Sequence, residues 1–184
     1  MIADRPLGTD RLSLRRFLAS DGPALHGILS RPAAVEFEPY DVVTHAQADD
    51  LARERASDPR FRAVETRGGT LVGTLYLAPS GPDWWRTWEL GYVFHPDHWG
   101  RGYATEACRA LLTAVFADGA HRVVARCDPA NVRSWALLER LGLRREAHHV
   151  RAVAFVADSD GGPVWHDAYT YAALAEEWAL SGTR

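Results

Sequence analysis

The alternation of apolar and polar residues predicts where the strands lie. Residues 11–17 alternate with a period of two, as expected of a strand with one buried face. The β-rich runs 61–67 and 70–78 flank Gly68-Gly69 and together predict a hairpin. Four further strands are predicted at 85–95, at 121–128 and, as a pair around a turn at 158–163, within 144–174.

A period close to that of a helical turn predicts four helices between these strands. The helices are a short one from Asp21, a polar one over 45–57 with Thr44 as its N-cap, one over 104–119, and one that begins at the N-cap Asn131 and ends before Gly142. Residues 31–44 show no periodicity and are predicted to be irregular. The order of elements predicts an α/β fold of mixed α+β type, with a central twisted sheet of about seven strands and helices on both faces.

The length of the chain limits the number of domains. It has 184 residues, of which 47% are apolar, and this is enough for one sizeable core but short for two. No repeat, linker or low-complexity segment interrupts the pattern. The sequence therefore predicts a single domain over residues 1–184.

Charge and composition exclude several classes of partner. The formal net charge of -3 gives no electrostatic basis for nucleic-acid binding. Residues 1–17 contain no apolar run fit for a signal sequence, so none is expected, and no run of about eighteen apolar residues predicts a membrane span. His95 and His98 have only Asp97 at ligand spacing, so no metal is expected. We expect a cytoplasmic protein with a small-molecule or peptide substrate.

The sequence Gly100-Arg101-Gly102 directly precedes a predicted helix. Glycines at such a position allow backbone N–H groups to close around an anion, and the helix dipole adds partial positive charge there. The same pattern also occurs in ordinary tight turns, so by itself it leaves both interpretations open.

Two segments resemble motifs of the GNAT superfamily of N-acetyltransferases. HPDHWGRGYATEA resembles motif A of that superfamily at Trp99, Gly102 and Ala104, and the tryptophan is typical of the branch of ribosomal-protein N-terminal acetyltransferases. NVRSWALLERLGLR resembles the downstream segment, and WHDAYTYAALAEEW resembles the last strand of that branch. The resemblance implies a single GNAT-like domain that uses acetyl-CoA as donor and needs no metal.

The resemblance also implies roles for particular residues. The backbone of Val93 and Phe94, on a strand that splays from its neighbour, would pair with the pantetheine arm. Asn131 and Ser134 would lie beside the pantetheine and the thioester sulfur, although Asn131 can serve as a helix cap as well. The remaining residues implied in coenzyme binding are Trp99, Gly100, Arg101, Gly102, Tyr103, Ala104 and Thr105.

The chemistry of amine acylation requires a base and a proton donor. An alkyl ammonium has a pKa of about 10.4 and a protein α-amine about 8, so a proton must be removed before attack. Glu89, at the start of the motif strand, is the candidate base, although an ion pair with an arginine is an equal alternative. Many GNAT relatives carry a tyrosine where Leu138 stands, so Ser134 and, less strongly, Tyr171 are the candidate donors to the leaving thiolate.

The amine acceptor is expected to bind among carboxylates and aromatic rings. One set lies in VEFEPY, with Glu36, Phe37, Glu38 and Tyr40, and the other is the tryptophan group Trp84, Trp85 and Trp88. Carboxylates with aromatic faces suit a cation, whereas tryptophans near a strand edge also serve as packing or dimer contacts. A protein N-terminal α-amine and a small primary amine both remain open as acceptors, and a homodimer is expected only by analogy.

Two other functions compete with N-acetyltransferase. The glycine loop is partly similar to a dinucleotide-binding fingerprint, but Thr105 occupies the third glycine position and a hairpin precedes the loop. A non-catalytic CoA-binding module is the other alternative, because Leu138 replaces the tyrosine.

Overall fold

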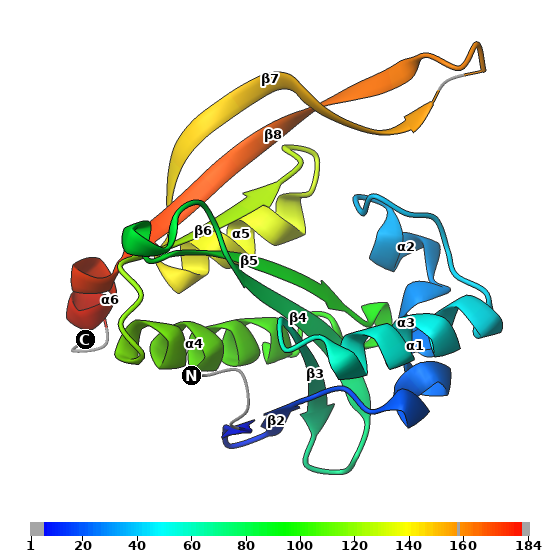
Figure 1. The fold of residues 1–184 in the computed structure, drawn as a ribbon, viewed down its shortest axis with the longest axis horizontal. Coiled ribbons are helices and arrows are strands. Elements are labelled where there is room, and N and C mark those ends of the chain that lie inside the picture. The colour runs from blue at the N-terminus through cyan, green and yellow to red at the C-terminus, as the bar shows by residue number, and fades with distance from the viewer. Residues whose placement is uncertain (1–5, 158, 182–184) are drawn as a thin grey trace.

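The computed structural model describes residues 6–157 and 159–181, which form one eight-stranded sheet with helices around it (Figure 1). The strand order is β1-β2-β3-β4-β5-β6-β8-β7. The strands are β1 (Leu7–Gly8), β2 (Leu12–Arg15), β3 (Phe61–Thr66), β4 (Leu71–Pro79), β5 (Thr87–Phe94), β6 (Arg122–Cys127), β7 (Arg144–Ala157) and β8 (Pro163–Leu174). The α-helices are α1 (Gly22–Leu29), α2 (Pro32–Val35), α3 (His45–Ser57), α4 (Tyr103–Ala117), α5 (Val132–Leu141) and α6 (Ala175–Ser181), and the 3₁₀ helices are η2 (Ala19–Asp21), η3 (Asp83–Trp85) and η4 (Pro96–His98).

The mixed sheet predicted from the sequence is confirmed, with eight strands instead of about seven. The additional strand is β1, which has two residues and pairs with β2 through Leu7 and Leu14. The prediction of an irregular segment over 31–44 is wrong at α2, and α6 follows the last strand as a helix that was not predicted. Trp85 belongs to η3 and not to the strand that follows it. Of the predicted turn at 158–163, Asp158 lies outside the described residues.

Helices cover both faces of the sheet because successive strand residues point to opposite sides. On one face, α4 and α5 pack with Val64 and Phe94 in the larger core. On the other face, α1 and α3 pack with Ala63 and Val93, the sequence neighbours of those residues. This alternation confirms the predicted three-layer arrangement.

The sheet divides between β5 and β6. These strands pair in parallel only at their beginnings, from Thr87 opposite Arg122 to Glu89 opposite Val124. Beyond that point β5 continues to Phe94 along β4, while β6 continues to Cys127 along β8. The edge of β5 after Glu89 therefore has no strand partner on that side, which is the splay that the family resemblance implied.

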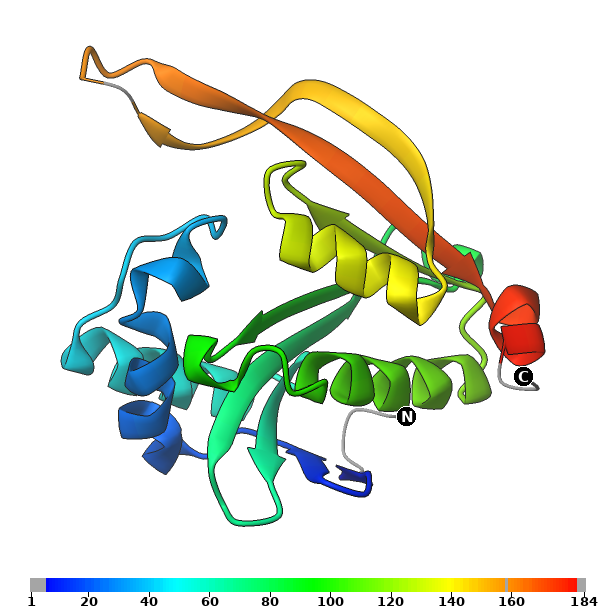
Figure 2. The same ribbon diagram turned by 180° about the vertical axis from the view of Figure 1, so that it is seen from behind.

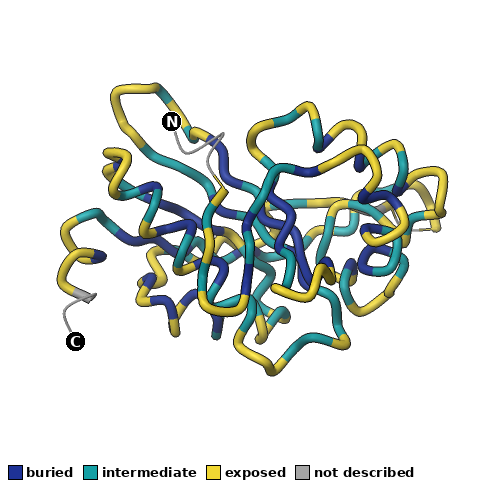
Figure 3. The backbone as a smooth tube through the Cα atoms, turned by 90° about the horizontal axis from the view of Figure 1, so that it is seen from below, coloured by how far each residue is buried: buried dark blue, intermediate teal, exposed yellow. Residues whose placement is uncertain are grey.

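The long β7–β8 hairpin extends past the rest of the sheet (Figures 1 and 2). β8 pairs with β6 only over Tyr169–Leu174, so its first half pairs with β7 alone. Buried residues concentrate in the central strands and on the inner faces of the helices (Figure 3). Among residues 6–157 and 159–181, no helix combines the length and apolar character needed to cross a lipid bilayer.

Candidate active site

The glycine loop takes a conformation that requires glycine at two positions. Gly100 and Gly102 have φ angles of +73° and +79°, which residues with a side chain rarely adopt. Gly102 is the N-cap of α4, the helix that begins at Tyr103. A Cβ atom placed on Gly100 would meet nothing within 4 Å, so the space beside the loop at this position is open.

The backbone of this loop presents unused hydrogen-bond donors. Between Gly100 and Thr105, no backbone N–H donates to another of the described residues. The first N–H groups of a helix have no partner within the helix, and the dipole makes this end partly positive. These donors form a cradle that suits an anion such as a diphosphate.

Two arginines from α5 add positive charge beside the cradle. Arg140 Nη1 donates to Thr105 Oγ1 at 3.4 Å, and the Arg133 guanidinium lies 4.6 Å from the centre of the Trp99 ring. Both arginines are exposed and therefore accessible to a ligand. Neither arginine is predictable from the sequence as part of this site, because their proximity to the loop depends on how α5 packs against α4.

Trp99 and Tyr103 hold the loop in place. The Trp99 indole Nε1 donates to the carbonyl oxygen of Phe94 at 2.9 Å, which ties the loop to the end of β5. The Arg11 guanidinium lies over the Tyr103 ring at 4.9 Å, and its Nη1 donates to the carbonyl oxygen of Arg101 at 3.0 Å. The Phe94 carbonyl is thus already bonded.

The backbone of β5 alternates between its two neighbours. The His95 N–H donates to the Val72 carbonyl of the β4 side, and hydrogen-bonded pairs of an antiparallel ladder alternate, so the backbone groups of Val93 point toward β4. On the open side of β5, the backbone groups of Tyr92 and the N–H of Phe94 face outward.

A cavity of about 230 Å³ lies where the sheet divides, and residues from both faces of the sheet line it. Glu89 and Gly91 face the side of α1 and α3, whereas Leu90 and Tyr92 face the side of α4 and α5. The cavity therefore connects the two faces at the open edge of β5. Its lining residues are Phe37, Glu38, Tyr76, Glu89, Leu90, Gly91, Tyr92, Arg126, Cys127, Asp128, Asn131 and Ser134.

Two hydroxyl groups meet on the α5 side of the cavity. Tyr92 Oη lies 2.9 Å from Ser134 Oγ, and burial raises the pKa of the tyrosine well above its ordinary value. Asn131 Oδ1 accepts the backbone N–H of Ser134 at 3.1 Å, which confirms its predicted role as the N-cap of α5. Burial also raises the pKa of the neighbouring Cys127 thiol to about 11. Tyr92 was missed from the sequence, although it lies on the motif strand.

Two carboxylates line the opposite side of the cavity. Glu89 Oε1 accepts from Arg126 Nη1 at 3.3 Å, so the ion pair considered as an alternative is present. Burial raises the pKa of Glu38 to about 7, although the Tyr40 hydroxyl and the charge of Arg55 act in the opposite direction. Burial likewise raises the pKa of Tyr40 to about 12. Glu38 is thus a carboxyl group that changes protonation state near neutral pH.

Several predicted residues lie away from this cavity. Glu36, in the same segment as Glu38, is exposed and is not among the lining residues. Tyr171 is fully buried and donates to Glu139 Oε1 at 2.9 Å, because its strand position points it toward α5. We therefore withdraw Tyr171 as a proton donor. Leu138 is buried in the core, and Trp84 and Trp85 line a second cavity further along the sheet.

Comparisons with known proteins identify the family of the chain. The model of the acetyltransferase (GNAT) domain family matches residues 11–144. The "Uncharacterized N-acetyltransferase YnaD" of Bacillus subtilis is 30% identical over 173 residues, which cover 92% of this chain and 97% of that protein. The crystal structure of a GNAT-family acetyltransferase from Bacillus anthracis has a TM-score of 0.84 at 29% identity, covering 94% of this chain and 99% of its own. Ribosomal-protein-S5-alanine acetyltransferase from Vibrio fischeri shares the fold, with a TM-score of 0.78 at 16% identity over 95% of this chain and 99% of its own.

A divided sheet with a glycine cradle and a family match over most of the chain define an acyltransferase fold. The chain belongs to the GNAT family and is an acetyl-CoA-dependent N-acetyltransferase. The predicted family and enzyme class are confirmed, and the dinucleotide-dependent oxidoreductase considered as a rival is wrong.

Proposed function

We propose that this enzyme transfers an acetyl group from acetyl-CoA directly to a primary amine while both substrates are bound. The observation that carries this proposal is the cavity at the divide between β5 and β6, which is lined by residues from both faces of the sheet. The donor approaches from the side of α4 and α5, and the acceptor approaches from the side of Glu38 and Glu89. Nucleophile and thioester can then meet without a covalent enzyme intermediate.

The donor is held by the cradle and by the open edge of β5. The N–H groups of residues 100–105 and the guanidinium groups of Arg133 and Arg140 bind the diphosphate. The pantetheine arm lies along the open edge of β5 after Glu89, where the backbone groups of Tyr92 and the N–H of Phe94 have no strand partner. Because Asn131 Oδ1 is used as the helix cap, its side-chain N–H₂ group is the part that can donate to the arm.

The acceptor loses its proton to a carboxylate on its own side of the sheet. Glu38 is the better matched of the two, because burial brings its pKa to about 7, whereas Glu89 is engaged by Arg126. A base with a pKa near the working pH is ionised often enough to accept a proton from an ammonium group. In this scheme Glu38 takes the proton, directly or through water, and Glu89 attracts the cationic acceptor.

The transfer step forms one bond and breaks one. The amine nitrogen attacks the thioester carbonyl, the carbon–nitrogen bond forms, and the carbon–sulfur bond breaks. Backbone N–H groups at the edge of β5 donate to the carbonyl oxygen as its negative charge grows. The Tyr92–Ser134 hydroxyl pair donates a hydrogen bond to the leaving thiolate, and burial keeps the phenol protonated in this role. The proton that the nitrogen loses as the amide forms neutralises the thiolate.

The experiment that tests this proposal combines binding and turnover. Calorimetric titration with CoA measures donor binding, and thiol release from acetyl-CoA across a panel of primary amines measures transfer. We expect binding with a dissociation constant in the micromolar range and turnover with some amines of the panel. CoA binding without thiol release for any amine would contradict the proposed transfer and leave only a CoA-binding module.

A further inference from the structure

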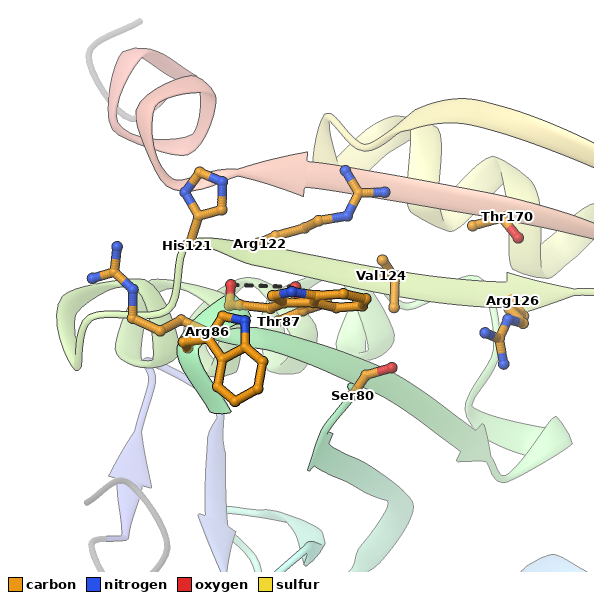
Figure 4. Close-up of a pocket in the computed structure, with 10 residues that line it drawn as sticks. Ser80, Arg86, Thr87, His121, Arg122, Val124, Arg126 and Thr170 are labelled. Atoms are coloured by element: carbon orange, nitrogen blue, oxygen red, sulfur yellow. Dashed lines mark hydrogen bonds between the residues drawn. The ribbon is translucent and has the colours of Figure 1, made fainter. Parts of the chain in front are cut away.

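A second cavity, of about 530 Å³, lies on the sheet face that also carries Glu89 (Figure 4). It extends along β6, with Arg86 and His121 at one end and Arg126 and Thr170 at the other (Figure 4). Its lining residues are Ser80, Trp84, Trp85, Arg86, Thr87, His121, Arg122, Val124, Arg126 and Thr170.

The second cavity adjoins the first. Arg126 lines both cavities, and its ion pair with Glu89 lies between them. Thr87 and Glu89 are two residues apart on β5 and therefore point to the same face. An acceptor with its amine between Glu38 and Glu89 can thus continue along this face into the second cavity.

Four of the ten residues that line the second cavity are arginine or histidine, and none is a carboxylate. Arg126 is paired with Glu89, and Arg122 is paired with Glu146. The Arg86 side chain, in contrast, makes no ion pair or hydrogen bond with any residue of the described ranges 6–157 and 159–181. One uncompensated positive charge therefore lies at the far end of the cavity, in a chain whose net charge is -3.

The backbone of Arg86 is held in an unusual conformation. Its φ angle is +47°, in the left-handed region that non-glycine residues seldom occupy. Its carbonyl oxygen accepts the backbone N–H groups of His121 at 2.9 Å and Arg122 at 3.3 Å, which fixes the residue between η3 and β6. Strained residues of this kind concentrate at functional sites. Here the two backbone hydrogen bonds hold the Cα atom from which the unpaired guanidinium extends.

Two tryptophans add apolar surface beside this charge. Trp84 is 80% exposed and Trp85 is 56% exposed, which is unusual for side chains of this size. The Trp85 ring packs against Gly81, where a Cβ atom would come within 2.6 Å of it. An indole face that is both fixed and exposed is suited to contact the apolar part of a ligand.

We propose that the second cavity binds a carboxylate of the acceptor, and that the acceptor is an extended, peptide-like amine with this carboxylate at about its third residue. This inference rests on the proposed function, because it places the amine between Glu38 and Glu89. Arg86 precedes Glu89 by three residues on the chain, so their Cα atoms are at most about 10 Å apart, and an extended peptide of three residues spans a similar length. A polyamine is disfavoured by the same charges, since its second ammonium would lie beside the unpaired guanidinium of Arg86.

The test compares tripeptide amides that differ only at the third residue. Initial rates of thiol release are measured for Ala-Ala-Asp, Ala-Ala-Asn and Ala-Ala-Lys amides at saturating acetyl-CoA. We expect kcat/KM to be roughly fivefold higher for the aspartate than for the asparagine peptide, as for one partly exposed ion pair, and lowest for lysine. Ala-Ala-Ala with a free C-terminus, compared with its amide, shows whether the carboxylate can also be that of the chain end.

Variants of Arg86 connect this preference to the cavity. Arg86→Gln is expected to bring the aspartate-to-asparagine ratio to about one, and Arg86→Lys is expected to keep most of it. Arg53→Gln is the matched control, because Arg53 is an exposed arginine on α3, with 60% of its side chain accessible, outside both cavities. This control should retain the wild-type ratio.

A binding measurement separates this inference from the proposed function. Acetylated Ala-Ala-Asp and Ala-Ala-Asn amides are titrated while tryptophan fluorescence is followed, and the aspartate peptide should bind roughly fivefold more tightly. Equal affinity and equal rates for the two peptides in the wild type would overturn the inference, even if both peptides are acetylated. Tighter aspartate binding without any thiol release would support the anion site and contradict the proposed transfer.

Discussion

The two sides of the divided sheet are built in different ways. The proposed donor side depends mainly on the backbone of one continuous stretch, from the end of β5 to Thr105 in the first turn of α4. The acceptor side depends on side chains from separate segments, with Glu38 before α3, Glu89 on β5, and Arg126 on β6. A continuous backbone suits a ligand that is always the same, whereas side chains from several segments can change with the acceptor.

The largest expected effect comes from breaking the donor side at Gly102. We expect Gly102→Asp to weaken CoA binding at least about a hundredfold, because it places a carboxylate beside the proposed diphosphate site, where an added Cβ already comes within 3.4 Å of Arg11 Nη2, and because the φ angle of +79° disfavours any side chain. Calorimetric titration with CoA measures the loss.

Gly119→Asp provides the control for this variant. Gly119 also has a positive φ angle, of +96°, and follows the other end of α4 with nothing within 4 Å of an added Cβ. The two substitutions carry similar backbone strain, so unchanged CoA affinity in Gly119→Asp shows that position on the helix matters. Equal loss in both variants would mean that the cradle does not bind the diphosphate.

The second expected effect breaks the acceptor side alone. Glu38→Gln should lower kcat/KM about a hundredfold at pH 7 and leave CoA affinity unchanged, because it removes the base but not the cradle. In the wild type, kcat/KM should fall as the pH drops below the Glu38 pKa of about 7, and this step should be absent from the variant. Glu36→Gln is the matched control, since Glu36 lies in the same segment outside the cavity. A wild-type pH profile in Glu38→Gln would transfer the role of base to Glu89.

Glu38→Gln is expected to lower activity but to raise the stability of the fold at neutral and alkaline pH. The pKa of Glu38 is raised by folding, from about 4.3 in an unfolded chain, so the folded state retains a proton that the unfolded state has lost. The stability that the protonated group contributes is present at low pH and is lost as the pH rises through about 7. The melting temperature of Glu38→Gln should therefore exceed that of the wild type at pH 8, and the difference should shrink toward pH 5. A constant difference across this range would contradict the raised pKa.

The third expected effect lies where the two sides meet. Tyr92→Phe removes the hydroxyl that lies 2.9 Å from Ser134 Oγ, and kcat should fall about tenfold, since a thiolate needs only modest help to leave. Ser134→Ala should have a similar effect, and the double variant should be no slower than the slower single one if the two hydroxyls act as one donor. Multiplicative losses in the double variant would show that they act independently.

The sequence predicted the fold well because most of its elements have a clear period. The seven strands that alternate or follow glycine turns are present, whereas β1 has two residues and α2 four, too few for any period. These short elements depend on packing, with β1 paired to β2 and Val35 of α2 buried in the core around α1.

The donor side was predictable and most of the acceptor side was not, for the same physical reason. The residues of the cradle are neighbours in the sequence, so a single sequence motif contains all of them. Tyr92 and Tyr171 both lie on strands, and only the position of α5 shows that Tyr92 reaches the cavity while Tyr171 bonds to Glu139. In the segment before α3, only the folded chain shows that Glu38 lines the cavity and Glu36 does not.

The smallest expected effect concerns Asn131, a residue on the donor side that is proposed to bind CoA through its side chain and not through its backbone. Asn131 caps α5 through Oδ1, and its N–H₂ group is proposed to bind the pantetheine arm. Asn131→Asp keeps an oxygen for the cap and removes the donor, whereas Asn131→Ala removes both. We expect the alanine variant to lose about 1 kcal/mol of unfolding free energy and the aspartate variant to lose little, as measured by urea denaturation. CoA affinity should fall severalfold in both variants, because neither can donate to the arm. If Asn131→Asp binds CoA as tightly as the wild type, Asn131 is a helix cap only, and the pantetheine arm is held by the backbone of β5 without it.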